Sequence, residues 1–152
     1  MTDWRARLLT RREQIEDVLE RFKIVAVVGI KPEDRASQPA HNVPAYMQAQ
    51  GYTIIPVPTY YPEVTEILGE PVYRDLRDIP PEAGVEVVNL FRRSDDVSGH
   101  VDEILAMSPL PKVVWVQLGI RNDDAAERFA KAGIDVIQDH CMLADHIAMA
   151  RS

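Results

Sequence analysis

The feature that most constrains this sequence is an alternation between short apolar runs, rich in Val and Ile, and longer amphipathic stretches. The apolar runs show no polar alternation, which is typical of strands buried on both faces of a parallel sheet. A helical stretch follows each strand, so the pattern predicts an α/β domain with a doubly wound parallel five-stranded sheet. The strands are expected at Lys23 to Gly29, Tyr52 to Val57, Val85 to Phe91, Lys112 to Leu118 and Ile134 to Ile137.

Helical spacing of apolar residues from Asp3 to Phe22 predicts an extra N-terminal amphipathic helix, so we divide the chain into residues 1–22 and a main domain of 23–152. Pro44 leaves the next helix ambiguous, because a proline inside a helix costs about 3 kcal/mol. That helix either starts at Pro39 and is kinked, or starts near Asn42. Later helices are expected at about 95–107, at 122–132 and at 140–151, with an irregular excursion from Pro56 to Pro81.

Charge and cysteine content narrow the classes of partner. The chain has 152 residues, the size of one domain, and a net charge of −7, which argues against nucleic acid and anionic membranes as partners. Cys141 is the only cysteine, so no internal disulfide can form and a reducing compartment is favoured. The N-terminus carries an early acid and no apolar stretch of the signal-peptide kind. We therefore expect a cytoplasmic protein.

Four segments should meet where ligands bind an open parallel sheet, outside the carboxyl ends of its strands. They are residues 29–42, 56–61, 91–94 and 117–121. Gly29 permits a tight turn and close approach of a ligand, and the following helix directs free N–H groups at the same place, which suits a phosphate. Polar residues of these segments form either a basic anion site or ordinary solvated loops: Lys31, Arg35, Ser37, Asn42, Arg92 and Arg93, with His41 as a further candidate contact.

Most familiar nucleotide and catalytic patterns are missing. Gly29 is not followed by the second and third glycines of a dinucleotide fingerprint, and the first acid after the second strand is Glu63. A Walker loop and a nucleophile elbow are absent too. Cys141 and His140 match no strong zinc or thiol-nucleophile pattern, and His100 is expected at the surface. The sequence therefore predicts no catalytic residues and no metal ligands, with Trp115 in the core.

Motifs along the chain, in order and in register, resemble a known family. They read Ile24-Val-Ala-Val-Val-Gly29, Asp34-Arg35 with Pro39-Ala-His41, Gly51-Tyr-Thr-Ile-Ile-Pro-Val57, Val72-Tyr73, Asn89-Leu-Phe-Arg-Arg-Ser94, Val114-Trp-Val-Gln-Leu-Gly119 and Asp139-His-Cys-Met142. This set resembles the small stand-alone CoA-binding proteins, whose domain is similar to the N-terminal CoA-binding domain of the succinyl-CoA synthetase alpha subunit. The resemblance runs from about Lys23 to the C-terminus.

The resemblance implies a Rossmann-like fold and coenzyme A as the ligand. It places Gly29, Ile30 and the loop from Lys31 to Ser37 around the CoA phosphates. It places Val57 and Pro58 against the adenosine, and Phe91, Arg92, Arg93, Gln117 and Leu118 against the pantetheine arm or the nucleotide. Relatives often read Pro-Val-Asn-Pro where this chain has Pro56-Val-Pro-Thr59, so one side-chain amide is lost at the adenosine end.

Two function classes follow, and the sequence leaves open whether the chain is an enzyme. The first is a non-catalytic module that binds CoA or an acyl-CoA, with no catalytic activity of its own. The alternative is an enzyme or a ligase-type subunit that acts on acyl-CoA with a partner chain. A nicotinamide-dependent dehydrogenase is the least favoured class, because its glycine fingerprint is absent. Self-association or a partner protein remains open for the N-terminal helix and for the excursion.

Overall fold

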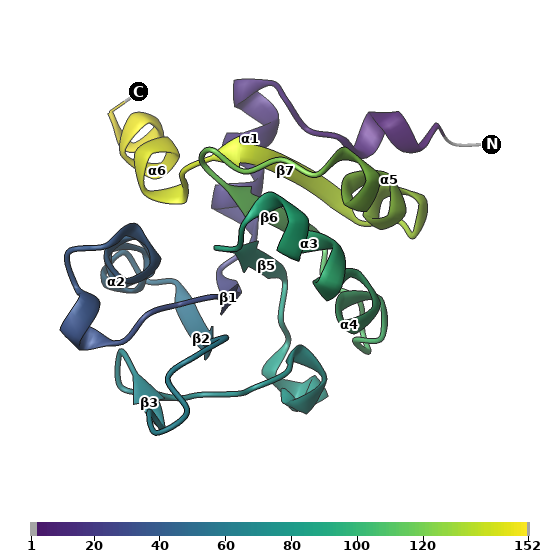
Figure 1. The fold of residues 1–152 in the computed structure, drawn as a ribbon. Helices are drawn as coiled ribbons and strands as arrows, with labels where there is room; N and C mark the ends of the chain where they lie inside the picture. The colour runs from purple at the N-terminus through teal and green to yellow at the C-terminus, as the bar shows by residue number, and fades with distance from the viewer. Residues whose placement is uncertain (1–2, 152) are drawn as a thin grey trace.

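The computed structural model describes residues 3–151 and contains the expected parallel sheet (Figure 1). A small antiparallel hairpin, β3 (Glu66–Ile67) and β4 (Glu70–Pro71), lies apart from this sheet. The sheet has the order β2-β1-β5-β6-β7, and every neighbouring pair is parallel. Its strands are β1 (Ile24–Val28), β2 (Thr53–Val57), β5 (Val87–Leu90), β6 (Val113–Gln117) and β7 (Asp135–His140).

This order makes β1 the point where the sheet changes direction. The chain leaves β1 for β2 on one side, then returns past β1 to pair with it again through β5 on the other side. A parallel sheet wound in both directions leaves a crevice outside the carboxyl ends of the two strands at the reversal. Here those ends are Val28 in β1 and Leu90 in β5, which are register partners.

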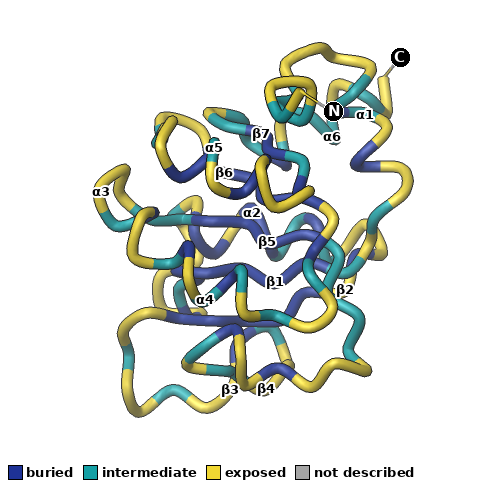
Figure 2. The backbone as a smooth tube through the Cα atoms, turned by 90° about the vertical axis from the view of Figure 1, so that its right-hand side faces the viewer, coloured by how far each residue is buried: buried dark blue, intermediate teal, exposed yellow. Residues whose placement is uncertain are grey.

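Helices cover both faces of the sheet and complete a three-layer Rossmann-like α/β fold, as expected. One face packs against α1 (Arg12–Arg21), α2 (Pro39–Ala49) and α6 (Met142–Ala150). The other packs against α3 (Ser94–Val97), α4 (Val101–Leu105) and α5 (Asp123–Lys131). The strands run through the buried centre, while the connecting segments lie outside (Figure 2). Trp115 is fully buried in β6, which confirms its predicted place in the core.

The helix expected over residues 3–22 was wrong in its first half. The described part begins with a 3-10 turn, Trp4–Arg7, and α1 starts only at Arg12; residues 1 and 2 lie outside the described part. Between them Leu8 forms a parallel bridge to Val136 of β7, and the Leu9 N–H donates to the Val136 carbonyl at 2.8 Å. β7 is an edge strand, and an edge needs cover for its unpaired backbone groups. The spacing of apolar residues within the segment could not show this pairing with a strand far along the chain.

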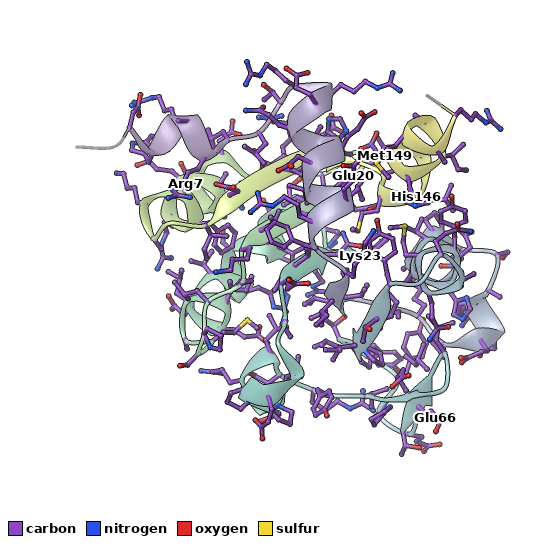
Figure 3. The ribbon with its side chains drawn as sticks, turned by 180° about the vertical axis from the view of Figure 1, so that it is seen from behind. Arg7, Glu20, Lys23, Glu66, His146 and Met149 are labelled. Atoms are coloured by element: carbon purple, nitrogen blue, oxygen red, sulfur yellow. The ribbon has the colours of Figure 1, made fainter. Side chains whose placement is uncertain are left out.

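The helix expected at 122–132 is α5, whereas the single helix expected at about 95–107 is divided into α3 and α4 by a 3-10 turn at Ser98–His100. Asn122 caps α5, because its side-chain oxygen accepts from the Ala125 N–H at 3.0 Å, and acidic residues occupy the first turns of α3 and α5. The final helix begins at Met142 rather than at His140, since β7 extends through His140. Seen from behind, α1 lies beside α6, with Glu20, Lys23, His146 and Met149 near their meeting point (Figure 3). No helix within residues 3–151 combines the length and the apolar character that crossing a bilayer requires.

Candidate ligand-binding site

The carboxyl ends of β1 and β5 approach each other very closely at Gly29. Its φ is +86°, and its N–H donates to the Val57 carbonyl of β2 at 2.9 Å. A Cβ at this position would lie 2.3 Å from the backbone oxygen of Phe91. Only glycine combines that dihedral angle with that contact. The sequence-based role of Gly29 as a tight turn thus has a structural basis in the strand that lies beside it.

The loop after β1 is tied to α2 through the site of Pro44. The helix starts at Pro39, so Pro44 lies inside it, which is the first of the two alternatives left by the sequence. Proline has no N–H to donate to the carbonyl four residues earlier. That carbonyl, on Ala40, instead accepts from the Lys31 N–H at 3.1 Å. The proline therefore frees a helix carbonyl that holds Lys31 beside the start of α2.

A cavity of about 540 Å³ opens at the reversal point of the sheet, and we call it the switch-point cavity. The ends of β1, β5 and β6 and the first residues of α2 contribute to it. Pro39 has no N–H, and the N–H groups of His41 and Asn42 both donate to the Gln38 carbonyl at 2.9 Å. Gln38 makes no side-chain cap, so the Ala40 N–H is the group that this helix end can offer to an anion. The cavity is lined by Gly29, Lys31, Gln38, Pro39, Ala40, Phe91, Arg92, Arg93, Ser94, Gln117, Leu118, Gly119 and Ile120.

A second cavity of about 470 Å³ lies at the end of β2, and we call it the loop cavity. It is lined by Pro58, Thr59, Tyr60, Pro62 and Arg74. The Arg74 guanidinium donates to the backbone carbonyls of residues 60, 61, 62 and 64, at 3.0, 3.1, 3.4 and 2.5 Å. The Arg74 side chain thus stabilises the conformation of residues 60–64 through their backbone carbonyls.

Arg92 connects the two cavities. Its guanidinium lines the switch-point cavity and donates from Nη1 to Oγ1 of Thr59, in the loop cavity, at 3.2 Å. Asp96 partly balances the charge, since its carboxylate lies 3.6 Å from Nη2 of Arg92 and 3.2 Å from Nε of Arg93. Arg93 is almost fully exposed. Arg92 is therefore more restrained by its contacts than Arg93. Its position between the two cavities suits an anion that extends from one cavity into the other.

Gln117 brings an unpaired acceptor to the switch-point cavity. Its side chain lies at the carboxyl end of β6 and is 5% exposed. The side-chain oxygen has no hydrogen-bond partner among the described residues. A buried polar atom without a partner costs free energy, which a ligand N–H would recover. Leu118, next along the chain, is 63% exposed and supplies an apolar wall.

The structure gathers half of the sequence-predicted site residues in one place. Gly29, Lys31, Phe91, Arg92, Arg93, Gln117 and Leu118 line the switch-point cavity, and Pro58 lines the loop cavity. Ile30 and Val57 are instead buried in the core on opposite faces of the sheet. Arg35 lies outside both linings, where a hydrogen bond with Tyr61 and the nearby Asp34 carboxylate raise its pKa. The ligand contacts expected at all these positions stay predictions.

The other three predicted residues also lie outside the two linings. His41 is 6% exposed and its Nε2 lies 3.9 Å from a carboxylate oxygen of Glu33. Asn42 is exposed, and its side-chain amide donates to the Ser37 carbonyl at 3.1 Å. These contacts tie the loop to itself and to the start of α2. A role of His41, Asn42 or Ser37 toward a ligand remains a prediction.

Two functional candidates escaped the sequence analysis. Arg74 lies far along the excursion, and no local pattern marks it as a partner of residues 60–64. His100 was expected at the surface, and that was wrong: its side chain is 16% exposed and bonded to Glu103 and Arg92. Within the described residues 3–151, no group of three or more His, Cys, Asp or Glu side chains could hold a metal ion.

Comparison with known proteins agrees with this geometry. The model of the CoA binding domain family matches residues 23–147. The chain belongs to the CoA-binding domain family. The matched range contains every lining residue of both cavities and leaves out the 3-10 turn and α1, which confirms the resemblance drawn from the motifs.

Relatives of this CoA-binding domain cover nearly its whole length. Uncharacterized protein YneT of Bacillus subtilis is 35% identical over 135 residues, 89% of this chain and 93% of that protein. The Thermus thermophilus protein cell-free ID.343 has a TM-score of 0.79 at 31% identity, covering 92% of this chain and 99% of its own. A hypothetical protein from Pyrococcus horikoshii has a TM-score of 0.80 at 30% identity, covering 93% of each chain. These neighbours share the fold.

Proposed function

We propose that this protein binds coenzyme A, or an acyl-CoA, across the two cavities, as a non-catalytic binding or regulatory module of the cytoplasm. The observation that carries the proposal is the switch-point cavity itself: in a chain of the CoA-binding domain family, Ala40 at the start of α2, Lys31 and Arg92 line one cavity together with Gly29. The protein carries a net charge of −7, so this local cluster supplies the attraction for an anion that the molecule as a whole does not.

The chemistry of CoA suits each part of the lining. Its phosphates match the start of α2 and the cations Lys31 and Arg92. The pantetheine arm carries amide N–H groups, and the buried oxygen of Gln117 is an acceptor in need of one. Leu118 and Ile120 offer apolar contact to its methylene and methyl groups. The adenosine end would then lie against Pro58 and Tyr60 in the loop cavity.

A binding role is also supported by what lines the switch-point cavity. Its described lining residues include the hydroxyl of Ser94, but no carboxylate, imidazole or thiol that would activate this hydroxyl or transfer protons itself. Its charged residues are Lys31, Arg92 and Arg93, which bind and orient anions. Catalysis on acyl-CoA would need groups from a partner chain.

The first test is calorimetric titration of the ligand-stripped protein with CoA, 3′-dephospho-CoA and NAD. We expect micromolar binding of CoA and none of NAD. Weaker binding of 3′-dephospho-CoA would assign a basic contact to the 3′-phosphate, and equal binding would leave the contacts on the pyrophosphate. Absence of CoA binding at millimolar ligand would reject the proposal. Turnover of an acyl-CoA by the isolated chain would replace it with the enzymatic alternative.

Charge-removing variants locate the site. Arg92→Met should weaken CoA binding about tenfold or more, the value of a hydrogen bond between charged groups. The matched control is Arg128→Met, because Arg128 is an exposed residue of α5 that pairs with Asp102 outside both linings. Equal affinities of the two variants would remove Arg92 from the site. Arg35→Glu tests the sequence-based phosphate contact, and an unchanged affinity would withdraw it.

A further inference from the structure

A chain of four hydrogen bonds runs from the excursion to the binding site through His100. The Leu76 N–H donates to Oε2 of Glu103 at 2.6 Å, and Oε1 of the same carboxylate lies 2.7 Å from Nδ1 of His100. On the other side of the ring, Nε of Arg92 lies 3.2 Å from Nε2 of His100. Arg92 then donates to Thr59. The chain therefore joins the excursion, α4 and the end of β5 to the loop after β2.

The partners of His100 differ in what they need from each ring nitrogen. A guanidinium has donors only, so Nε2 of His100 must offer a lone pair to Arg92. A carboxylate is an acceptor, so Nδ1 must carry the proton that His100 donates to Glu103. The arrangement is satisfied by one neutral tautomer. An imidazolium would point a second N–H at the Arg92 cation and leave neither group with an acceptor there.

Burial restricts the side chains of this network and thereby the position of Arg92. The side chains of His100 and Glu103 are 16% and 11% exposed, and Arg92 is 29% exposed. Glu103 makes two hydrogen bonds, to the Leu76 backbone and to His100, so it cannot turn away without leaving a donor unpaired. The long Arg92 side chain would otherwise sample many rotamers, at an entropic cost paid on binding. Its position between the cavities is therefore set before a ligand arrives.

We infer that His100 is a positioning residue, which accepts from Arg92 and thereby holds the guanidinium across the two cavities for an anionic ligand. This inference rests on the proposed binding of CoA for its functional readout. It goes beyond that proposal because His100 and Glu103 lie outside both cavity linings and touch no ligand space. His100 acts through Arg92 alone.

The decisive experiment compares three substitutions in the full chain, with CoA affinity measured by calorimetry. His100→Leu removes the acceptor and should weaken binding about tenfold, by the scale of one hydrogen bond to a charged group. His100→Gln can accept from Arg92 with its oxygen and donate to Glu103 with its amide, so it should recover most of that loss. In an Arg92→Met background, His100→Leu should cause no further loss, because its effect passes through Arg92.

Two results would overturn the inference while leaving CoA binding intact. The first is wild-type affinity in His100→Leu, and the second is an undiminished loss from His100→Leu when Arg92 is already absent. Circular dichroism of each variant shows that it is folded. A substitution that merely damaged packing would not be rescued by Gln or silenced by Arg92→Met.

Imidazole nitrogen NMR tests the same geometry without any ligand. We expect a proton on Nδ1 and a bare Nε2, the arrangement that Glu103 and Arg92 require. An imidazolium, or the opposite tautomer, would overturn the inference whether or not CoA binds. If the expected tautomer is found but the wild-type protein fails to bind CoA, the proposed function fails and the structural role of His100 toward Arg92 stands.

Discussion

Gly29→Ala is the most direct test of how the binding edge is built. The new Cβ would meet the Phe91 carbonyl oxygen at 2.3 Å and the Phe91 carbonyl carbon at 3.1 Å, and real Cβ contacts essentially never fall under 3.0 Å. Neither atom can swing aside as the tip of a side chain could. The Phe91 N–H is bonded to the Val28 carbonyl at 2.9 Å, so the two strand ends must separate together.

The expected cost has two parts. An L-residue in the left-handed region costs roughly 1–2 kcal/mol. Overpacking against fixed atoms costs roughly another 1–3 kcal/mol. Against a typical total stability of about 5–15 kcal/mol, Gly29→Ala should remove a large share of the free energy of unfolding. At about 2–4 °C per kcal/mol, the thermal midpoint should fall by about 10 °C. CoA affinity should fall as well, because Phe91 and Arg92 would shift.

Gly119→Ala supplies a matched control. Gly119 has φ +85°, almost the same as Gly29, but nothing lies within 4 Å of the position that its Cβ would take. Gly119→Ala therefore measures the cost of the dihedral strain alone. The difference between the free energies of unfolding of the two variants, measured by urea denaturation, gives the cost of the close contact at Gly29. A Gly29→Ala protein no less stable than Gly119→Ala would refute the close-approach argument.

Two further perturbations test the surroundings of the site and the opposite end of the sheet. Arg74→Met should speed amide hydrogen exchange in residues 60–64 and weaken CoA binding several-fold, because four carbonyls lose their donor. Arg77→Met is the control, and equal exchange rates in the two variants would contradict this role of Arg74. Burial and the Lys23 ammonium lower the pKa of His146, so the unfolded chain takes up this proton first and stability falls as the pH drops below about 6.5 toward the folded value. His146→Gln should make the free energy of unfolding depend less on pH in this range. If urea melts from pH 7 to pH 5 give the variant and the wild-type protein the same slope of unfolding free energy against pH, the effect is excluded.

Local periodicity accounts for what the sequence predicted well. Strands buried on both faces must be apolar along their whole length, so β1, β5 and β6 were recognisable to within one or two residues of their ends. Because the carboxyl ends of parallel strands meet at one edge of a sheet, the sequence alone predicted that the four candidate ligand-binding segments lie together. The family motifs then indicated the family and suggested CoA as the ligand, which periodicity alone cannot name.

Contacts between distant segments account for what the sequence could not predict. Leu8 and Leu9 fit a helix by spacing, yet the open edge of β7 draws them into an extended segment. Pro44 is tolerated inside α2 because the Lys31 N–H takes the carbonyl that it frees. His100 looked like a surface residue, because its i, i+3 spacing to Glu103 does not show that Glu103 also binds the Leu76 N–H or that Arg92 lies on the other side of the ring.

The sequence by itself determined the fold class, the family and the edge of the sheet at which we propose that a ligand binds, because these depend on patterns within short windows of the chain. Only the tertiary structure decided which polar side chains stand at that edge and what holds them. Arg92 became the central cation through Asp96 and His100, which follow it along the chain, and through Thr59 from the loop after β2. The pairing of Arg92 with Asp96 follows an i, i+4 spacing that the sequence contains. The contact with Thr59 joins residues 33 positions apart, and the spacing of residues along the chain does not encode it.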